Sequence, residues 1–296
     1  MIPFVRDFDF AYGRRDQVSP LIQRVVAKNP GPFTYTGTST FIVGKPDPGS
    51  GVAVIDPGPA DPAHLAAILA AVEDRTVSHI LVTHTHRDHS PLAHPLAEAV
   101  GARILAAQPP EHSTQVSRPL DEAEDDRFRP DTILLGGETI AGDGWTMEAL
   151  FTPGHASNHV AFALEDEHAL FCGDHVMGWS TTVVAPPDGN MTAYMESLDA
   201  VIARGYRTLW PTHGPPITSP APFLDAYRAH RLDREAQILE RVLAGTGEIE
   251  KIVSVLYAAV DPGLWPAASL SVRAHLEKLV REGSVKVDRA GRYVAG

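Results

Sequence analysis

The chain has 296 residues, of which 44% are hydrophobic and 21% charged, as in a typical folded globular protein. Its formal net charge of −12 argues against a broad electrostatic grip on nucleic acid or on an anionic membrane. The single cysteine, Cys172, excludes a disulfide framework. The N-terminus lacks the pattern of a signal peptide, and no apolar run approaches the ~18 residues of a membrane span. We therefore expect a cytoplasmic protein without membrane contact.

Most of the chain alternates short predicted strands with predicted helices. Runs rich in β-branched residues and bounded by turn residues predict strands over 38–43, 51–55, 77–83, 103–106, 139–140, 146–151, 160–164, 169–172 and 208–210. Longer segments predict helices over 63–72, 96–100 and 191–203. The first helix follows Asp61-Pro62, an N-cap with proline at the first helical position. The first two strands are expected to form a hairpin.

Two segments are predicted to shape the mouth of a pocket. Residues 109–130 are polar, acidic and without periodicity, which indicates a long loop that is partly mobile. Residues 186–191 have the composition of a turn.

The composition changes at a long amphipathic helix predicted over 221–244. Further helices over 249–259 and 267–281 precede a two-stranded ribbon over 285–287 and 292–294, which is the element order of a winged helix. A boundary near residue 220 therefore divides a domain of residues 1–220 from a domain of residues 221–296. From residue 231 onward the chain has ten basic and nine acidic residues, a net charge of +1, so the rest carries −13. If RNA is bound, this C-terminal part is the less repulsive surface.

Four candidate metal ligands lie together after the strand predicted over 77–83. His84, His86, Asp88 and His89 occupy six consecutive positions. Residues two apart on a strand share a face, so His84 and His86 can point the same way. Imidazole nitrogens and carboxylate oxygens are ligands that zinc accepts. A solvated polar loop is the alternative, but it explains four such groups less well.

Three more candidate ligands follow other predicted strands. His155 ends the turn Thr152-Pro153-Gly154-His155, Asp174 lies in Gly173-Asp174-His175, and His213 lies in Thr212-His213-Gly214. Ligands at strand-to-loop junctions can meet at one edge of a sheet, so these three residues strengthen the prediction of a metal site.

The ordered set of these seven residues resembles the metallo-β-lactamase fold hydrolases. It is most similar to the LACTB2-like subgroup, which carries a C-terminal winged-helix-like domain. The resemblance runs from about Thr38 to the end of the chain. It implies a four-layer αββα sandwich with the site at one edge of the two sheets. It also implies that His84, His86 and His155 hold one metal, that Asp88, His89 and His213 hold a second, and that Asp174 bridges them.

One departure from the family pattern follows the ligand run. The family often has Ser/Thr-Gly-Gly after the Asp-His pair, whereas this chain has Ser90-Pro91-Leu92-Ala93. The ligands are unaffected. Without the two glycines, however, we do not expect the close approach of the backbone at this turn that the family shows, and the resemblance does not assign a substrate.

Two divalent ions, most readily Zn²⁺ with Fe or Mn as alternatives, would share a bridging hydroxide that attacks a carbonyl or phosphoryl centre. Asp88 would be both a ligand and the orienter of that hydroxide. A small thioester or related ester is the first choice of substrate, and single-stranded RNA is the second. Two alternative hypotheses for the function are a mono-iron persulfide dioxygenase and a non-enzymatic winged-helix regulator. The sequence leaves the oligomeric state open, and a homodimer is compatible with it.

Other residues allow both a functional and a structural interpretation. His159, four residues after His155, either faces the substrate as a proton donor or packs behind the site. Thr83 and Thr212 are candidates to hydrogen-bond the ligands. His175 and Cys172 are expected to be structural, and Trp179 is expected in the core rather than in a pocket. The remaining histidines lack partners at ligand spacing and are expected on the surface or in the core: His64, His79, His94, His112, His168, His230 and His275.

Overall fold

The computed structural model describes residues 1–110 and 124–296, so most of the loop predicted over 109–130, with His112, lies outside the described residues. The helices are α1 (Pro62–Val72), α2 (Ala93–Val100), α3 (Met191–Arg204), α4 (Pro220–Leu243), α5 (Ile249–Leu256) and α6 (Trp265–Arg281), with 3₁₀ turns η1 (Glu165–Glu167) and η2 (Pro262–Leu264). The strands are β1 (Arg15–Gln17), β2 (Ile22–Val26), β3 (Ser39–Val43), β4 (Gly51–Ile55), β5 (Thr76–Leu81), β6 (Arg103–Ala106), β7 (Thr132–Ile133), β8 (Thr139–Gly142), β9 (Trp145–Phe151), β10 (Val160–Leu164), β11 (Ala169–Gly173), β12 (Thr208–Pro211), β13 (Val285–Val287) and β14 (Tyr293–Ala295).

Two sheets pack face to face in the larger part of the molecule. One has seven strands in the order β1 to β7, and the other has five in the order β12-β11-β10-β9-β8. Their facing sides form a core that includes Phe41, Leu81, Phe162 and Phe171. Burial of such side chains is the main favourable term in folding.

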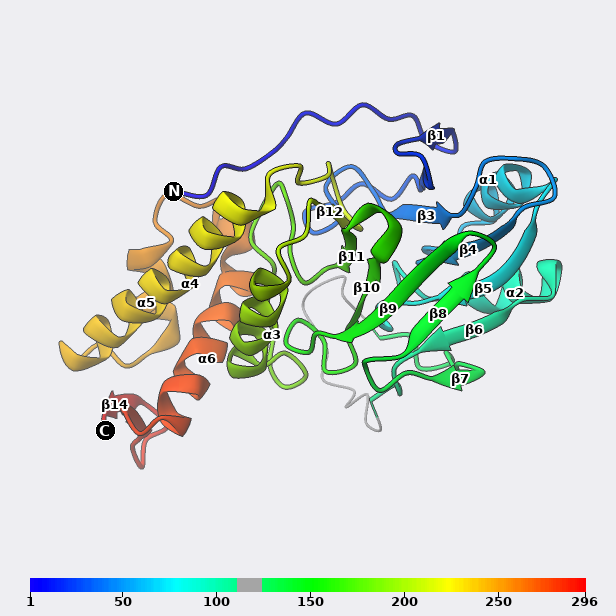
Figure 1. The fold of residues 1–296 in the computed structure, drawn as a ribbon. Coiled ribbons are helices and arrows are strands. Elements are labelled where there is room, and N and C mark those ends of the chain that lie inside the picture. The colour runs from blue at the N-terminus through cyan, green and yellow to red at the C-terminus, as the bar shows by residue number, and fades with distance from the viewer. Residues whose placement is uncertain (111–123) are drawn as a thin grey trace.

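Helices cover the two outer faces of the sheets. Ile68 of α1 and Leu96 of α2 pack on the seven-stranded sheet. Leu198 of α3 and Phe223 of α4 pack on the five-stranded sheet. Figure 1 shows α1 and α2 on one side of the sheets and α3 and α4 on the other. The expected four-layer αββα sandwich is thus confirmed.

Strand direction determines where the site forms. Strands β4, β5 and β6 are parallel, as are β11 and β12. Parallel neighbours end at the same edge of a sheet, so the segments that follow β4, β5, β11 and β12 come together. The hairpin expected from the first two predicted strands is formed by β3 and β4, which pair antiparallel.

Three strands of the first sheet were not predicted from the sequence. In β2, the polar pair Gln23-Arg24 interrupts the apolar pattern, although both side chains are buried. The Arg24 guanidinium lies over the ring of Phe8, 4.4 Å from its centroid, and this contact compensates part of the burial cost. Strands β1 and β7 are short edge strands with little periodicity.

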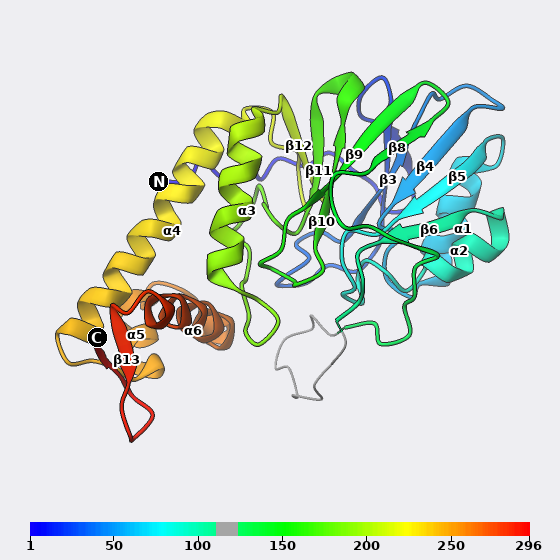
Figure 2. The same ribbon diagram turned by 60° about the horizontal axis from the view of Figure 1, so that its bottom comes forward.

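The C-terminal helices and the β13–β14 ribbon surround a separate core that includes Val253, Val272, Leu276 and Val285. Helix α4 contributes to both cores, because Tyr227 packs in the sandwich and Ile238 packs in the C-terminal module. Figure 2 shows α4 running from the sandwich into the module. The boundary predicted near residue 220 falls at the first residue of this helix. No helix in the described part of the chain has the length and apolarity needed to cross a membrane.

Candidate metal centre

All seven predicted ligands lie at one edge of the sandwich. The run from His84 to His89 follows β5, His155 follows β9, Asp174 follows β11 and His213 follows β12. Their ligand atoms form three overlapping groups, each within 4.8 Å: His84, His86 and His155; His84, His89 and Asp174; Asp88, His89 and His213. The strand-to-loop junctions therefore converge as the sequence predicted.

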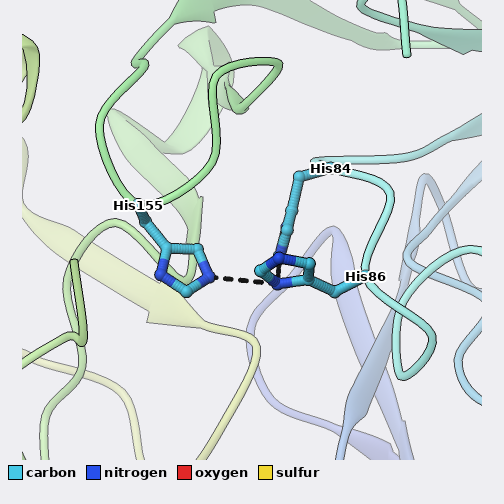
Figure 3. Close-up of side chains that lie close together, drawn as sticks. All are labelled: His84, His86 and His155. Atoms are coloured by element: carbon cyan, nitrogen blue, oxygen red, sulfur yellow. Dashed lines mark hydrogen bonds between the residues drawn. The ribbon is translucent and has the colours of Figure 1, made fainter. Parts of the chain in front are cut away.

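The first group consists of three imidazoles that point at one another. His86 Nδ1 lies 2.8 Å from His84 Nε2 and 3.2 Å from His155 Nε2. Figure 3 shows His155 approaching the other two rings from a different segment of the chain. Three imidazole nitrogens directed at one point are a donor set that suits a cation such as Zn²⁺.

Asp88, His89 and His213 combine two imidazoles with a carboxylate, and they are called the second group from here on. Asp88 Oδ2 lies 3.1 Å from His213 Nε2 and 3.5 Å from His89 Nε2. Asp174 Oδ2 lies between the two groups, 3.4 Å from His213 Nε2 and 3.8 Å from His155 Nε2. Asp174 is therefore placed where one carboxylate can serve both groups.

Electrostatics in the first group favour neutral imidazoles. Burial, followed by the neighbouring histidines, lowers the pKa of His84 and of His86 well below the usual range. A neutral ring keeps a lone pair on one nitrogen, which is the form that binds a metal.

The second group depends on its carboxylates. Burial alone would lower the pKa of His213, but Asp174 and Asp88 raise it to about 10. Burial likewise opposes ionisation of Asp174, yet His213 and His89 hold its pKa well below the usual range. These anions thus require positive charge beside them, and a divalent cation supplies it in place of imidazolium protons.

Buried atoms without hydrogen-bond partners support the same fit. Among the described side chains, His89 Nε2 and Asp174 Oδ1 are buried and have no hydrogen-bond partner. A buried polar atom left unsatisfied is costly, and a metal ion at this position satisfies such atoms. The residues present therefore fit a metal centre.

Each ligand histidine is oriented through its other ring nitrogen, as is usual around protein metal sites. These contacts are His84 Nδ1 to Thr83 Oγ1 (3.0 Å), His86 Nε2 to Glu124 Oε1 (3.6 Å), His89 Nδ1 to Asp56 Oδ2 (2.9 Å), His155 Nδ1 to the Val183 carbonyl (2.7 Å) and His213 Nδ1 to the Gly37 carbonyl (3.3 Å).

Asp56 is the residue that sequence reasoning missed. Its fully buried carboxylate accepts hydrogen bonds from the Thr83 amide and hydroxyl, both at 2.8 Å, from the Thr212 hydroxyl at 3.0 Å and from His89. Of the two threonines expected to support the ligands, Thr83 contacts His84 directly and also donates to Asp56, whereas Thr212 acts through Asp56. The signal in the sequence is an acidic residue directly after the apolar strand over 51–55, at a strand-to-loop junction like those of the ligands.

His159 lies behind the ligands rather than among them. Its Nε2 accepts a hydrogen bond from the Asp174 amide at 3.2 Å, and its Nδ1 lies 2.8 Å from Thr152 Oγ1. Because the ring is fully buried and both nitrogens are engaged, the geometry favours the packing interpretation over a proton donor. Cys172 is also fully buried, and burial raises the pKa of its thiol, so it is not activated as a nucleophile.

Gly173 provides a test of this support. Its φ is +51°, and a Cβ at this position would lie 2.4 Å from His159 Nε2. We expect Gly173→Ala to displace His159, loosen Asp174 and lower metal affinity measurably in a chelator competition assay. Gly205→Ala is the matched control, because Gly205 has a similar φ of +65° with no atom within 4 Å. Equal metal affinity in the two variants would refute the role given to His159.

Residues 186–191, which were predicted to shape a pocket mouth, contact the loop that carries His155. Asp188 Oδ2 accepts a hydrogen bond from the Ser157 amide at 2.9 Å, and Asn190 caps α3. The segment therefore supports the loop that carries His155.

The fold and the ligand set define a metal-dependent hydrolase. The metallo-beta-lactamase superfamily model matches residues 34–213, and the model of the beta-lactamase associated winged helix domain matches residues 249–292. The chain belongs to the metallo-beta-lactamase superfamily. Both the fold and the family expected from the sequence are thus confirmed.

Several known proteins are similar over most of this chain. An "Atrochrysone carboxyl ACP thioesterase" of Aspergillus chevalieri is 32% identical over 255 residues, covering 82% of this chain and 75% of that protein. A "Beta-lactamase-like protein 2 homolog" of Caenorhabditis elegans is 30% identical over 277 residues, covering 92% and 88%. A beta-lactamase domain protein from Burkholderia ambifaria has the same fold, with a TM-score of 0.80, 22% identity and coverage of 100% and 97%.

Proposed function

We propose that this protein is a two-metal hydrolase of thioesters. The observation that carries the proposal is the pair of three-ligand groups with Asp174 placed between them. A complete second group favours two ions over the single iron of a persulfide dioxygenase. The thioester preference is supported by the relative named as a thioesterase, whose similarity covers 82% of this chain and 75% of that protein.

In this proposal His84, His86 and His155 would hold one divalent ion, Asp88, His89 and His213 would hold the other, and Asp174 would be available to both. Zn²⁺ suits these nitrogen and oxygen donors, and Fe or Mn would also be accepted. The ions, when bound, supply Lewis acidity and lower the pKa of a water molecule toward neutrality.

The side chain of Asp88 is more accessible than those of its neighbours in the site. It is 22% exposed, compared with 7% for Asp174 and 1% for His213. Asp88 therefore faces the side from which a substrate arrives. One carboxylate oxygen contacts His89 and His213, and the carboxylate can orient an attacking water and accept its proton.

Metal removal tests the proposal directly. Exhaustive chelation should abolish thioester hydrolysis, and titration with Zn²⁺ should restore it, reaching a plateau near two ions per chain by elemental analysis. Circular dichroism before and after chelation controls for unfolding. Full activity in the metal-free protein would contradict the mechanism.

A substrate panel tests the thioester assignment. The metal-loaded protein should hydrolyse acyl-thioesters faster than lactones, a chromogenic β-lactam or single-stranded RNA. Preferred cleavage of RNA would refute the assignment while leaving the metal centre intact. One iron per chain together with oxygen consumption on a persulfide would instead indicate a dioxygenase.

A further inference from the structure

A cavity of about 210 Å³ lies between the sandwich and the C-terminal module. One wall is the segment that follows the ligand Asp174, including Trp179, Thr182 and Val183, and the other comes from α4 and the residues after α5. His230, expected on the surface or in the core, and Trp179, expected in the core, both line this cavity.

Arg231 places a buried cation in the cavity wall. The residue is only 4% exposed, and its guanidinium donates a hydrogen bond to the Thr182 carbonyl. The group lies 5.0 Å from the centroid of the Tyr194 ring, while its Nε has no partner among the described residues. Burying a cation without a carboxylate is costly, and none of the described carboxylates forms an ion pair with it.

Arg234 adds a second cation one turn further along α4. Its Nη1 donates to the Leu256 carbonyl at 3.0 Å, and its guanidinium lies 4.3 Å from the centroid of the Tyr257 ring. No aspartate or glutamate is among the described residues that line the cavity. In a chain with a net charge of −12, a cavity with two arginines and no acid is a selective environment for an anion.

The cavity and the metal centre share a wall. The Val183 carbonyl orients His155, and the Thr182 hydroxyl donates to the Asp174 carbonyl at 2.8 Å. Trp179 packs beside Gly214, where a Cβ would lie 2.8 Å from the indole ring. A molecule held in the cavity therefore lies beside the loops that carry three of the ligands.

We propose that this cavity binds an anionic group, a carboxylate or a phosphate, at the end of the substrate remote from the scissile bond. Arg231 and Arg234 would hold the anion, and the apolar side chains of Val260 and Leu264 would contact the adjoining hydrocarbon. This inference rests on the proposed thioesterase function and adds to it the charge of the substrate.

Two matched substrate pairs distinguish the sources of the anion. Glutaryl- and pentanoyl-N-acetylcysteamine differ by a carboxylate in the acyl part, whereas butyryl-phosphopantetheine and butyryl-pantetheine differ by a phosphate in the carrier. In the wild type, the anionic member of one pair should have a KM lower by about tenfold, the effect of one charge-assisted hydrogen bond. Arg234→Gln should remove this preference by raising that KM, with kcat nearly unchanged.

Arg228→Gln is the control, because Arg228 lies on the same helix but forms an exposed ion pair with Asp199 outside the cavity. It should keep the preference between the paired substrates. Arg231→Lys is a second variant that retains the buried charge, so it tests the guanidinium with less risk of unfolding. It should weaken the preference as well.

A binding measurement separates this proposal from the proposed function. Calorimetry with benzoate and phenyl phosphate should show binding to the metal-loaded wild type and at least one of them binding about tenfold more weakly to Arg234→Gln. Such binding in a protein that hydrolyses no thioester would support the cavity and refute the thioesterase assignment. Thioester hydrolysis without an Arg234-dependent preference, and without Arg234-dependent binding, would overturn the cavity proposal alone.

Discussion

Asp88→Ala should lower kcat/KM on the best thioester by about 10³-fold or more, because it removes both a proposed metal ligand and the carboxylate proposed to orient the attacking water. The seven ligands come from four separate junctions, so the fold should survive the loss of one of them. Steady-state kinetics, metal content and thermal unfolding measured on one preparation separate these effects.

Asp47→Ala is the matched control for this prediction, since Asp47 is an exposed aspartate in the loop between β3 and β4. It should retain wild-type rates and two metals per chain. An Asp88→Ala protein with rates within a few-fold of the wild type would show that Asp88 has no catalytic role.

Asp56→Asn should damage the site from behind. The carboxylate accepts from Thr83, Thr212 and His89, and an amide offers one acceptor oxygen in place of two while adding N–H donors. We expect a loss of about 2–4 kcal/mol in the free energy of unfolding. We also expect metal affinity to fall about 10–100-fold, the usual effect of removing a group that orients a ligand. Chemical denaturation and chelator competition measure the two quantities.

Asparagine is the right replacement because the φ of Asp56 is +49°, a conformation that asparagine tolerates and alanine does not. Asp61→Asn provides the control, because asparagine also serves as an N-cap and this helix start is partly exposed. If Asp56→Asn and Asp61→Asn were equally stable and bound metal equally well, the supporting role of Asp56 would be wrong.

The convergence of the seven candidate ligands could be predicted because these residues lie in short, recognisable sequence motifs. His84, His86, Asp88 and His89 stand in one segment, and the other three ligands each follow an apolar strand. A residue that directly follows a strand lies at the edge of the sheet, and this placement does not depend on how the side chains of the core pack. The sequence therefore identifies seven candidate ligands, and the fold brings their side chains together.

What supports the ligands was less predictable. Asp56 acts through partners 27 and 156 positions away, and no local pattern reports such contacts. Strand β2 was missed because buried Gln23 and Arg24 contradict the apolar pattern of an interior strand. The cavity was missed for a related reason, since Arg231 and Arg234 look like ordinary polar positions of an amphipathic helix until the facing wall is known.

Helix α4 has consequences for how this architecture can diversify. The two family models end and begin at residues 213 and 249, so the helix occupies the stretch between them. Its 24 residues span about 36 Å at the rise of an α-helix, and its side chains pack in both cores. A module exchanged between relatives at residue 249 would have to pack against Ile238 and Val242, which stay with the sandwich. An exchange that includes α4 would also transfer Arg231 and Arg234, which line the cavity. The substrate preference could then change in one step, while the residues of the metal centre stayed the same.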